Sequence, residues 1–283
     1  MSQAPEPFLK AGLYIVATPI GNLGDITMRA AETLRGVAAV ACEDTRVTGR
    51  LLNHLGVKAR MIRYDDHADE RAREGILALA TDSAVALVSD AGTPLISDPG
   101  FRLVREARER GIAVTSLPGP SALIVALTLA GLPTDRFVFA GFLPAKAKAR
   151  GEALEELASV RATLVFYESG PRLVASLGSI GQALPGREVA VARELTKLFE
   201  ECRTGSAAEL AEHYEAHPAK GEIVLLVGPP TQTIAAPDAG EIDRLLIAAM
   251  ENAKASQAAG EIARMHGLDR KTLYARALEL QGK

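Results

Sequence analysis

Short apolar runs alternate with amphipathic stretches through the first half of the chain. Continuous apolar runs occupy residues 13–17, 38–42, 84–89 and 113–117. Runs of this length without polar alternation are typical of strands buried on both faces, as in a parallel sheet. The amphipathic stretches between them predict crossover helices. Residues 1–130 are therefore expected to form an α/β domain with a doubly wound parallel sheet.

Two of the expected helices have recognisable starts. Thr27 precedes a stretch with regularly spaced apolar residues, and its hydroxyl is a suitable N-cap. A second helix is predicted to be capped by Ser97 or Asp98, with Pro99 in its first turn and Phe101 on its apolar face.

A second set of apolar runs covers residues 137–142, 163–167, 188–192 and 222–228. Glycines and prolines interrupt the chain just before this set, in residues 131–144. Fewer helical stretches separate these runs, although residues 205–214 predict one. Residues 131–230 are therefore expected to form a second α/β domain with a mixed sheet.

The C-terminal region has a different pattern. Residues 231–240 are rich in Ala, Pro and Thr and predict a linker. Residues 240–283 predict a small helical unit, in which a tight turn at Gly267 and a cap at Asp269 separate two helices. The second of these helices carries Leu273, Tyr274 and Leu278. This is the helix-turn-helix pattern, and it leaves open whether the helices contact nucleic acid or only pack together.

Composition narrows the function classes. Hydrophobic residues make up 48% of the 283 residues and charged residues 24%, as in globular domains. The longest strongly apolar stretch, residues 122–132, is too short to cross a bilayer, and no secretion signal is recognisable. Cys42 and Cys202 provide neither a disulfide framework nor zinc-ligand spacing. We therefore expect a cytoplasmic protein without a membrane partner.

The net charge of −3 argues against a protein that coats nucleic acid over its whole surface. The sequence nevertheless contains three clusters of Lys and Arg. Each cluster is either a solvated face of the protein or part of a local binding surface for a polyanion, and both interpretations stay open. The clusters are Arg50, Lys58, Arg60 and Arg63; Lys146, Lys148 and Arg150; and Arg264, Arg270, Lys271 and Arg276.

Loops rich in Gly and Pro follow three of the expected strands. The first, residues 16–27, lacks the G-x-G-x-x-G fingerprint, and the chain has no G-K-[ST], so dinucleotide and P-loop sites are disfavoured. The second (SDAGTPLISDPG, residues 89–100) and the third (LPGPSAL, residues 117–123) are suited to wrapping a ligand at the carboxyl ends of strands.

These segments resemble the tetrapyrrole methylase superfamily, the class III methyltransferases. The similarity is carried by residues 18–27, 42–46, 89–100, 118–122, 166–172 and 193–201, which span both expected α/β domains. Within the superfamily, the chain is most similar to the branch that methylates small-subunit ribosomal RNA. The terminal helical unit also resembles a domain appended in that branch.

The resemblance implies two α/β domains that hold S-adenosylmethionine between them, and a homodimer. Carried over by motif position, the expected cofactor contacts come from three loops of the first domain and one strand end of the second. They are Ile20, Gly92, Thr93, Ile96, Ser121, Ala122, Tyr167 and Glu168.

Two departures from the superfamily bear on the substrate. Members that modify tetrapyrroles usually have Gly-Asp-Pro where this chain has Gly92-Thr93-Pro94, and Gly-Arg-Gly where it has residues 98–100. With the CEDTR motif at residues 42–46, these differences fit the ribosomal branch. The implied reaction is methylation of a cytidine 2′-hydroxyl in the decoding region of 16S ribosomal RNA. An assembled 30S subunit is the expected substrate, with free RNA left open.

A ribose hydroxyl is a poor acid, so a proton acceptor is useful. Glu168 and Glu43 or Asp44 are candidates because they follow expected strands. Lys197 is another candidate if burial makes its amine neutral, although it could instead hold a phosphate. No metal site is predicted, because His213 and His217 lack a carboxylate partner at suitable spacing.

Three other functions compete with this hypothesis. A methylase of a small porphyrinoid would need neither a helix-turn-helix nor basic patches. A non-catalytic regulator that binds nucleic acid through residues 256–280 would not need two cofactor-type loops. A dehydrogenase is disfavoured by the missing glycine fingerprint.

Overall fold

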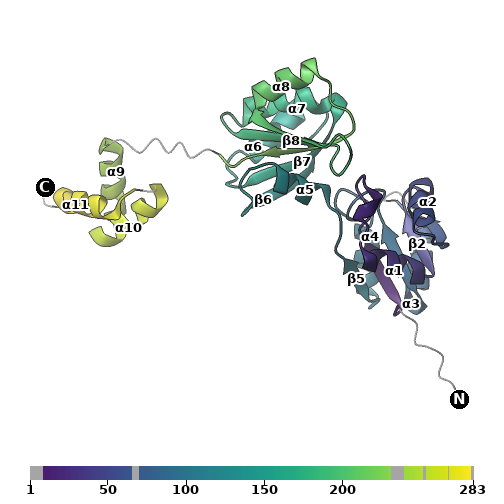
Figure 1. Ribbon diagram of the computed structural model, residues 1–283. Helices are drawn as coiled ribbons and strands as arrows, with labels where there is room; N and C mark the ends of the chain where they lie inside the picture. Colours follow the sequence, from purple (N-terminus) through teal and green to yellow (C-terminus); the bar gives the residue numbers. More distant parts are fainter. Residues whose placement is uncertain (1–8, 66–69, 231–238, 251–252, 267, 282–283) are drawn as a thin grey trace. The chain divides into compact units, whose positions relative to one another are not determined.

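The computed structural model describes residues 9–65, 70–230, 239–250, 253–266 and 268–281. Residues 1–230 form one compact unit and residues 231–283 form another. The first unit contains both sheets, whereas the described part of the second is helical (Figure 1).

The first sheet is parallel throughout, as the continuous apolar runs predict. In spatial order its strands are β3 (Arg60–Arg63), β2 (Ala39–Cys42), β4 (Ala84–Val88), β1 (Gly12–Val16) and β5 (Val114–Leu117). β2 and β4 are buried along their whole length, which explains why their sequences show no polar alternation. Because all strands run the same way, the loops that follow them lie along one edge of the sheet.

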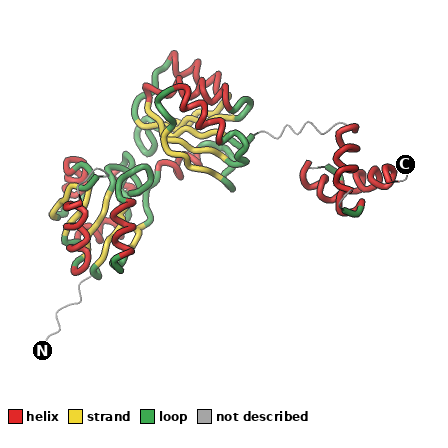
Figure 2. The backbone as a smooth tube through the Cα atoms, turned by 180° about the vertical axis from the view of Figure 1, so that it is seen from behind, coloured by secondary structure: helices red, strands yellow, loops and turns green. Residues whose placement is uncertain are grey.

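Helices cover both faces of this sheet (Figure 2). α1 (Met28–Gly36) and α2 (Thr45–His54) pack on one face, and α3 (Glu70–Asp82) and α4 (Phe101–Glu109) pack on the other. The predicted cap of α1 is confirmed, because the Thr27 side chain accepts a hydrogen bond from the Ala30 N–H at 3.1 Å.

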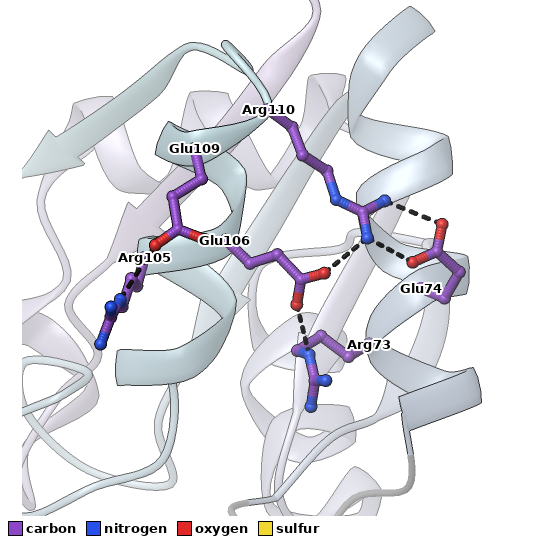
Figure 3. Close-up of polar contacts among 6 residues, drawn as sticks. All are labelled: Arg73, Glu74, Arg105, Glu106, Glu109 and Arg110. Atoms are coloured by element: carbon purple, nitrogen blue, oxygen red, sulfur yellow. Dashed lines mark hydrogen bonds and ion pairs between the residues drawn. The ribbon is translucent and has the colours of Figure 1, made fainter.

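Ion pairs join α3 to α4 (Figure 3). Arg110 contacts the carboxylates of Glu74 at 2.6 Å and Glu106 at 2.5 Å. Glu106 also accepts from Arg73 at 2.6 Å. These shared partners hold two helices that are far apart in the sequence in one arrangement on the sheet.

The predicted start of α4 is wrong. α4 begins at Phe101, its N-cap is Gly100, and no side chain caps it. Ser97 has a left-handed backbone with φ of 60°, so residues 97–99 continue the preceding loop instead of starting the helix. Phe101 is 66% exposed, in contrast to the predicted apolar contact.

The second sheet is mixed, which confirms the predicted fold class. Its spatial order is β6 (Phe137–Phe142), β7 (Thr163–Ser169), β10 (Glu222–Val227), β8 (Glu188–Arg193) and β9 (Glu201–Ser206). β6 and β7 are parallel, and the other neighbouring pairs are antiparallel. α6 (Ala147–Glu156), α7 (Gly170–Ala183) and α8 (Ala207–Ala216) pack on one face of this sheet.

α5 (Ala122–Leu129) packs on the opposite face of the second sheet, although it directly follows β5 of the first. Leu123 and Leu127 are buried there in the same cluster as Val165 and Leu226. The domain boundary expected at residue 130 thus lies beyond a helix whose packing already belongs to the second sheet. α5 therefore links the two sheets, because it follows a strand of the first and packs on the second.

Two strands, β3 and β9, were not predicted from the sequence. Each lies at the edge of its sheet, where one side of the ladder is open. Their sequences, RMIR and ECRTGS, are polar and largely exposed. The apolar runs that identified the other strands, including the edge strands β5 and β6, are absent from these two.

The second compact unit contains α9 (Ala239–Met250), α10 (Ala255–His266) and α11 (Arg270–Gln281), packed around a small apolar core. The predicted cap at Asp269 is confirmed, because its carboxylate accepts from the Thr272 N–H at 2.8 Å. In α11, Leu273 is buried, whereas Tyr274 and Leu278 are 42% and 47% exposed. The predicted turn at Gly267 lies outside the described residues.

None of the helices in the described ranges is both long and apolar enough to cross a membrane.

Candidate functional site

Three loops meet at the carboxyl ends of β4, β1 and β5, which are adjacent in the first sheet. Thr18, after β1, exchanges backbone hydrogen bonds with Gly92 in the loop after β4 at 2.8 and 3.0 Å. Its hydroxyl also donates to the Ser89 carbonyl at 3.1 Å. The Thr93 hydroxyl donates to the carbonyl of Pro120, after β5, at 3.0 Å. The loops therefore hold one another in place without a ligand.

Unusual backbone conformations gather in the loop after β4. Gly100 has φ of 131°, and a Cβ atom there would lie 2.8 Å from Leu87 Cδ2, so only glycine fits. Leu95 and Ser97 have φ of 74° and 60°, where side chains other than glycine are disfavoured. Across the described ranges, the other non-glycine residues with positive φ are Glu194 and Thr196, in the loop after β8.

The cavity between these loops is lined by residues from both sheets. It includes every residue that the family resemblance marked for the cofactor, and Lys197 as well. Those residues are Ile20, Gly92, Thr93, Ile96, Ser121, Ala122, Tyr167, Glu168 and Lys197. The structure thus brings together segments that are up to 177 residues apart in the chain, from Ile20 to Lys197.

An aromatic wall closes one side of the cavity. Tyr167 lies edge-on to Phe139 and Phe142, with ring centroids 4.9 and 5.7 Å apart. Tyr167 and Phe142 line the cavity, and Phe142 remains 55% exposed. Sequence reasoning found Tyr167 through its motif but missed Phe142, whose run of apolar residues suggested only a buried strand.

The cavity is acidic. Its lining contains Asp90, Asp98, Glu194 and Glu222 besides Glu168, against Lys197 as the cation within the described lining. Sequence reasoning assigned no binding role to these four acids. The signal for two of them was present, because Asp90 and Asp98 lie inside the unusual segment SDAGTPLISDPG.

Asp98 is the most strongly perturbed of these acids. Burial raises its pKa to about 6, and the nearby charges of Glu43, Asp90 and Glu222 act in the same direction. A hydrogen bond with Ser89 acts against this shift. Asp98 is therefore a carboxylate that changes its charge just below neutral pH.

Glu168 is buried, and neighbouring groups engage both of its carboxylate oxygens. One accepts from the Ser169 N–H at 2.9 Å and lies 3.2 Å from Arg172 Nε. The other accepts from the Ser176 hydroxyl at 2.6 Å. The carboxylate thereby joins the end of β7 to the first turns of α7.

The remaining predicted acid–base residues have different surroundings. Lys197 donates to Glu194 at 3.0 Å and is 37% exposed at its side chain. Asp44 is not part of the described cavity lining. It caps α2 and forms a 2.6 Å ion pair with Arg46, which holds the pKa of Asp44 well below its usual range.

Of the three clusters of Lys and Arg found in the sequence, two have fewer cations available to a ligand than their sequences suggest. Arg150 is 6% exposed and donates to Ser179 and to the carbonyls of Pro144 and Ala145, so it is a structural residue. Arg276 is paired with Asp243 at 2.6 Å and also with Glu279. The group formed by Arg50, Lys58, Arg60 and Arg63 remains exposed, along the end of α2 and the edge strand β3.

Comparison with protein families identifies the fold. The family of tetrapyrrole (corrin/porphyrin) methylases matches residues 12–211, and an RsmI C-terminal HTH domain matches residues 236–281. Two solved structures share the fold of the first unit. They are a uroporphyrin-III-C-methyltransferase from Thermus thermophilus (TM-score 0.55, 22% identity) and a cobalt precorrin-4 methyltransferase (TM-score 0.56, 16% identity). They cover 77% and 76% of this chain, and the match includes 94% of each of those proteins.

Similar curated proteins cover almost the whole chain. A protein named ribosomal RNA small subunit methyltransferase I from Erythrobacter litoralis is 64% identical, over 98% of this chain and 97% of its own length. A protein of the same name from Mesorhizobium japonicum is 52% identical, over 99% and 96%. That from Escherichia coli O157:H7 is 49% identical, over 95% and 96%. The chain therefore belongs to the tetrapyrrole methylase family and is an S-adenosylmethionine-dependent methyltransferase.

Proposed function

We propose that this enzyme transfers the methyl group of S-adenosylmethionine to the 2′-hydroxyl of a cytidine in the decoding region of 16S ribosomal RNA. Relatives that are 49–64% identical over nearly the full length carry the name ribosomal RNA small subunit methyltransferase I, which supports this substrate. The match of residues 236–281 to that group's C-terminal domain supports it independently of the methylase fold. The choice of the ribose oxygen comes from the family resemblance.

The observation that carries the cofactor assignment is the acidic cavity. S-adenosylmethionine bears a sulfonium and an ammonium against one carboxylate, so its net charge is positive. Asp90 and Glu222 complement a cation and would repel the phosphates of a dinucleotide. The rings of Tyr167 and Phe142 in the same lining offer apolar surface for a purine base.

The chain's own residues would hold and orient the reacting groups. S-adenosylmethionine supplies an electrophilic methyl group on its sulfonium. The interlocked loops carry Ile20, Thr93 and Ser121 to fixed positions, while Ile96 and Tyr167 add apolar surface to the lining. Alignment of this kind contributes about 7–11 kcal/mol to catalysis, whereas a positioned base contributes about 3–5 kcal/mol. Glu168 would act by fixing β7 to α7 at the lining of the cavity.

We also propose that the enzyme works as a homodimer in the cytoplasm, on the assembled 30S subunit. The family resemblance supports the dimer. The exposed cations along α2 and β3 and the second compact unit are surfaces suited to ribosomal RNA.

Mass spectrometry of 16S ribosomal RNA from cells with and without this enzyme tests the proposal. One ribose-methylated cytidine should disappear in the deletion strain and return on complementation. Purified enzyme with labelled cofactor should modify 30S subunits from the deletion strain, and uroporphyrinogen should remain unlabelled. An unchanged RNA methylation pattern would exclude the RNA substrate, and labelled uroporphyrinogen would support a porphyrinoid methylase. Light scattering of the purified chain measures the oligomeric state.

A further inference from the structure

Asp98 shares the cavity lining with Glu168 and Lys197 but comes from a different loop. It lines the cavity from the loop after β4 and is partly buried. Its loop is held to the neighbouring loops by the backbone hydrogen bonds between Gly92 and Thr18 and by the bond from the Thr93 hydroxyl to the Pro120 carbonyl. A constrained loop presents a carboxylate with less loss of side-chain freedom than a mobile loop would.

Several other polar groups of the cavity have partners within the protein, as Asp98 has in Ser89. Both oxygens of Glu168 are bound by residues of β7 and α7. Lys197 and Glu194 neutralise each other. Asp90 accepts from the Asp44 N–H at 3.2 Å.

The electrostatic surroundings of Asp98 suit proton transfer. The charged groups that act on it come from three places: Glu43 before α2, Asp90 in its own loop, and Glu222 at the start of β10. Burial and these like charges raise its pKa to about 6, against a usual value of 3.8. Such a carboxylate is ionised at neutral pH and is a stronger base than an ordinary aspartate.

We propose that Asp98 accepts the proton of the acceptor hydroxyl during methyl transfer. This inference rests on the proposed function, because it requires a hydroxyl as nucleophile. The oxygen forms a bond to the methyl carbon as the carbon–sulfur bond breaks. The bond's electron pair stays on sulfur, which becomes a neutral thioether. The hydroxyl proton passes to the Asp98 carboxylate, and the resulting carboxylic acid later releases it to water.

The test is the Asp98→Asn variant, assayed on 30S subunits beside the wild type. We expect kcat to fall by about 10²–10⁴-fold, the range that a general base contributes. The dissociation constant for S-adenosylmethionine, measured by calorimetry, should change less than about threefold, or under about 0.7 kcal/mol. The wild-type rate should decline below pH 6, and the variant should lack this inflection. Asp98→Glu should recover part of the rate.

Thermal unfolding of the cofactor-free protein provides a readout that does not depend on activity. Because the folded state raises the pKa of Asp98, its ionisation is unfavourable to folding, and this cost builds up as pH rises from about 3.8 to about 6. Asp98→Asn should therefore melt a few degrees above the wild type at pH 8, and the difference should shrink to about half at pH 5. Asp82→Asn, at an exposed position in α3, is the matched control and should match the wild type in rate and melting temperature.

Three outcomes would overturn the assignment. In the first, kcat of Asp98→Asn equals that of the wild type. In the second, cofactor binding weakens more than tenfold with kcat preserved, which would make Asp98 a cofactor contact. In the third, Asp98→Asn melts below the wild type at pH 8, as a purely structural hydrogen bond to Ser89 would predict. A wild-type enzyme that fails to methylate 30S subunits would refute the proposed function itself, whatever the variant does.

Discussion

Replacing Glu168 with alanine separates a structural carboxylate from a catalytic one. The structure engages this side chain through the Ser169 N–H at 2.9 Å, the Ser176 hydroxyl at 2.6 Å and Arg172 at 3.2 Å. The Glu168 side chain is 0% exposed, whereas that of Arg172 is 33% exposed. Removing one member of a buried ion pair costs about 3–5 kcal/mol, and the partial exposure of Arg172 places this case near the lower end.

We expect Glu168→Ala to lower the free energy of unfolding by about 3 kcal/mol, which corresponds to a melting temperature about 6–12 °C lower in a unit of this size. Glu168→Gln keeps a side chain that can bond to Ser176 but loses the charge, and it should cost about 1–2 kcal/mol. Glu188→Ala, at the exposed start of β8, is the control and should stay within about 0.5 kcal/mol of the wild type.

Thermal scans and urea unfolding of the three variants measure these differences, and single-turnover methylation of 30S subunits measures the chemical step below the melting temperature. A Glu168→Gln protein that keeps its melting temperature within 1 °C, yet loses more than a hundredfold in rate, would refute the structural interpretation. Glu168 would then again be a candidate for the proton acceptor.

Three further predictions concern other parts of the enzyme. Gly100→Ala, with φ of 131° and a Cβ 2.8 Å from Leu87, should destabilise the fold by about 1–3 kcal/mol and weaken cofactor binding in calorimetry. Glu106→Gln removes its pairs with Arg73 and Arg110, so it should lower the melting temperature at low salt and less so in 0.5 M NaCl. Since the pKa of Glu106 is held below its usual 4.5, this contribution should be present above pH 4.5 and disappear as pH falls further. S-adenosylmethionine should bind more tightly than the neutral product S-adenosylhomocysteine, and Glu222→Gln should reduce that ratio in competition assays.

Much of the fold could be predicted because buried strands leave a strong sequence signal. β2 and β4 are apolar along their whole length, and they were predicted at nearly their observed bounds. The strands β3 and β9 have no such run, because their sequences RMIR and ECRTGS are mostly polar, unlike those of the edge strands β5 and β6. α5 is apolar on all sides, so its sequence could not reveal which sheet it covers.

The site was predictable to the extent that it depends on local motifs. Ser97 and Asp98 read as a helix cap because a short polar residue before proline is a common helix start. The structure instead continues the loop to Gly100, and the charges that perturb Asp98 come from Glu43 and Glu222, which are distant in sequence. Similarly, the sequence marked Glu168 through its motif but not its partner Ser176, which is brought near by the turn from β7 into α7.

The cavity concentrates features that cost stability in the absence of a ligand. Left-handed residues such as Leu95 and Thr196 cost about 1–3 kcal/mol each, and neighbouring acids such as Asp90 and Asp98 repel each other. The two sheets, with their separate apolar cores, offset these costs. A cationic ligand reduces the repulsion between these acids. By mass action, cofactor at a hundredfold excess over its dissociation constant adds about 2.7 kcal/mol to the free energy of unfolding. When methyl transfer removes the sulfonium charge, acids such as Asp90 and Glu222 lose part of their counter-charge, and the cavity favours release of the product.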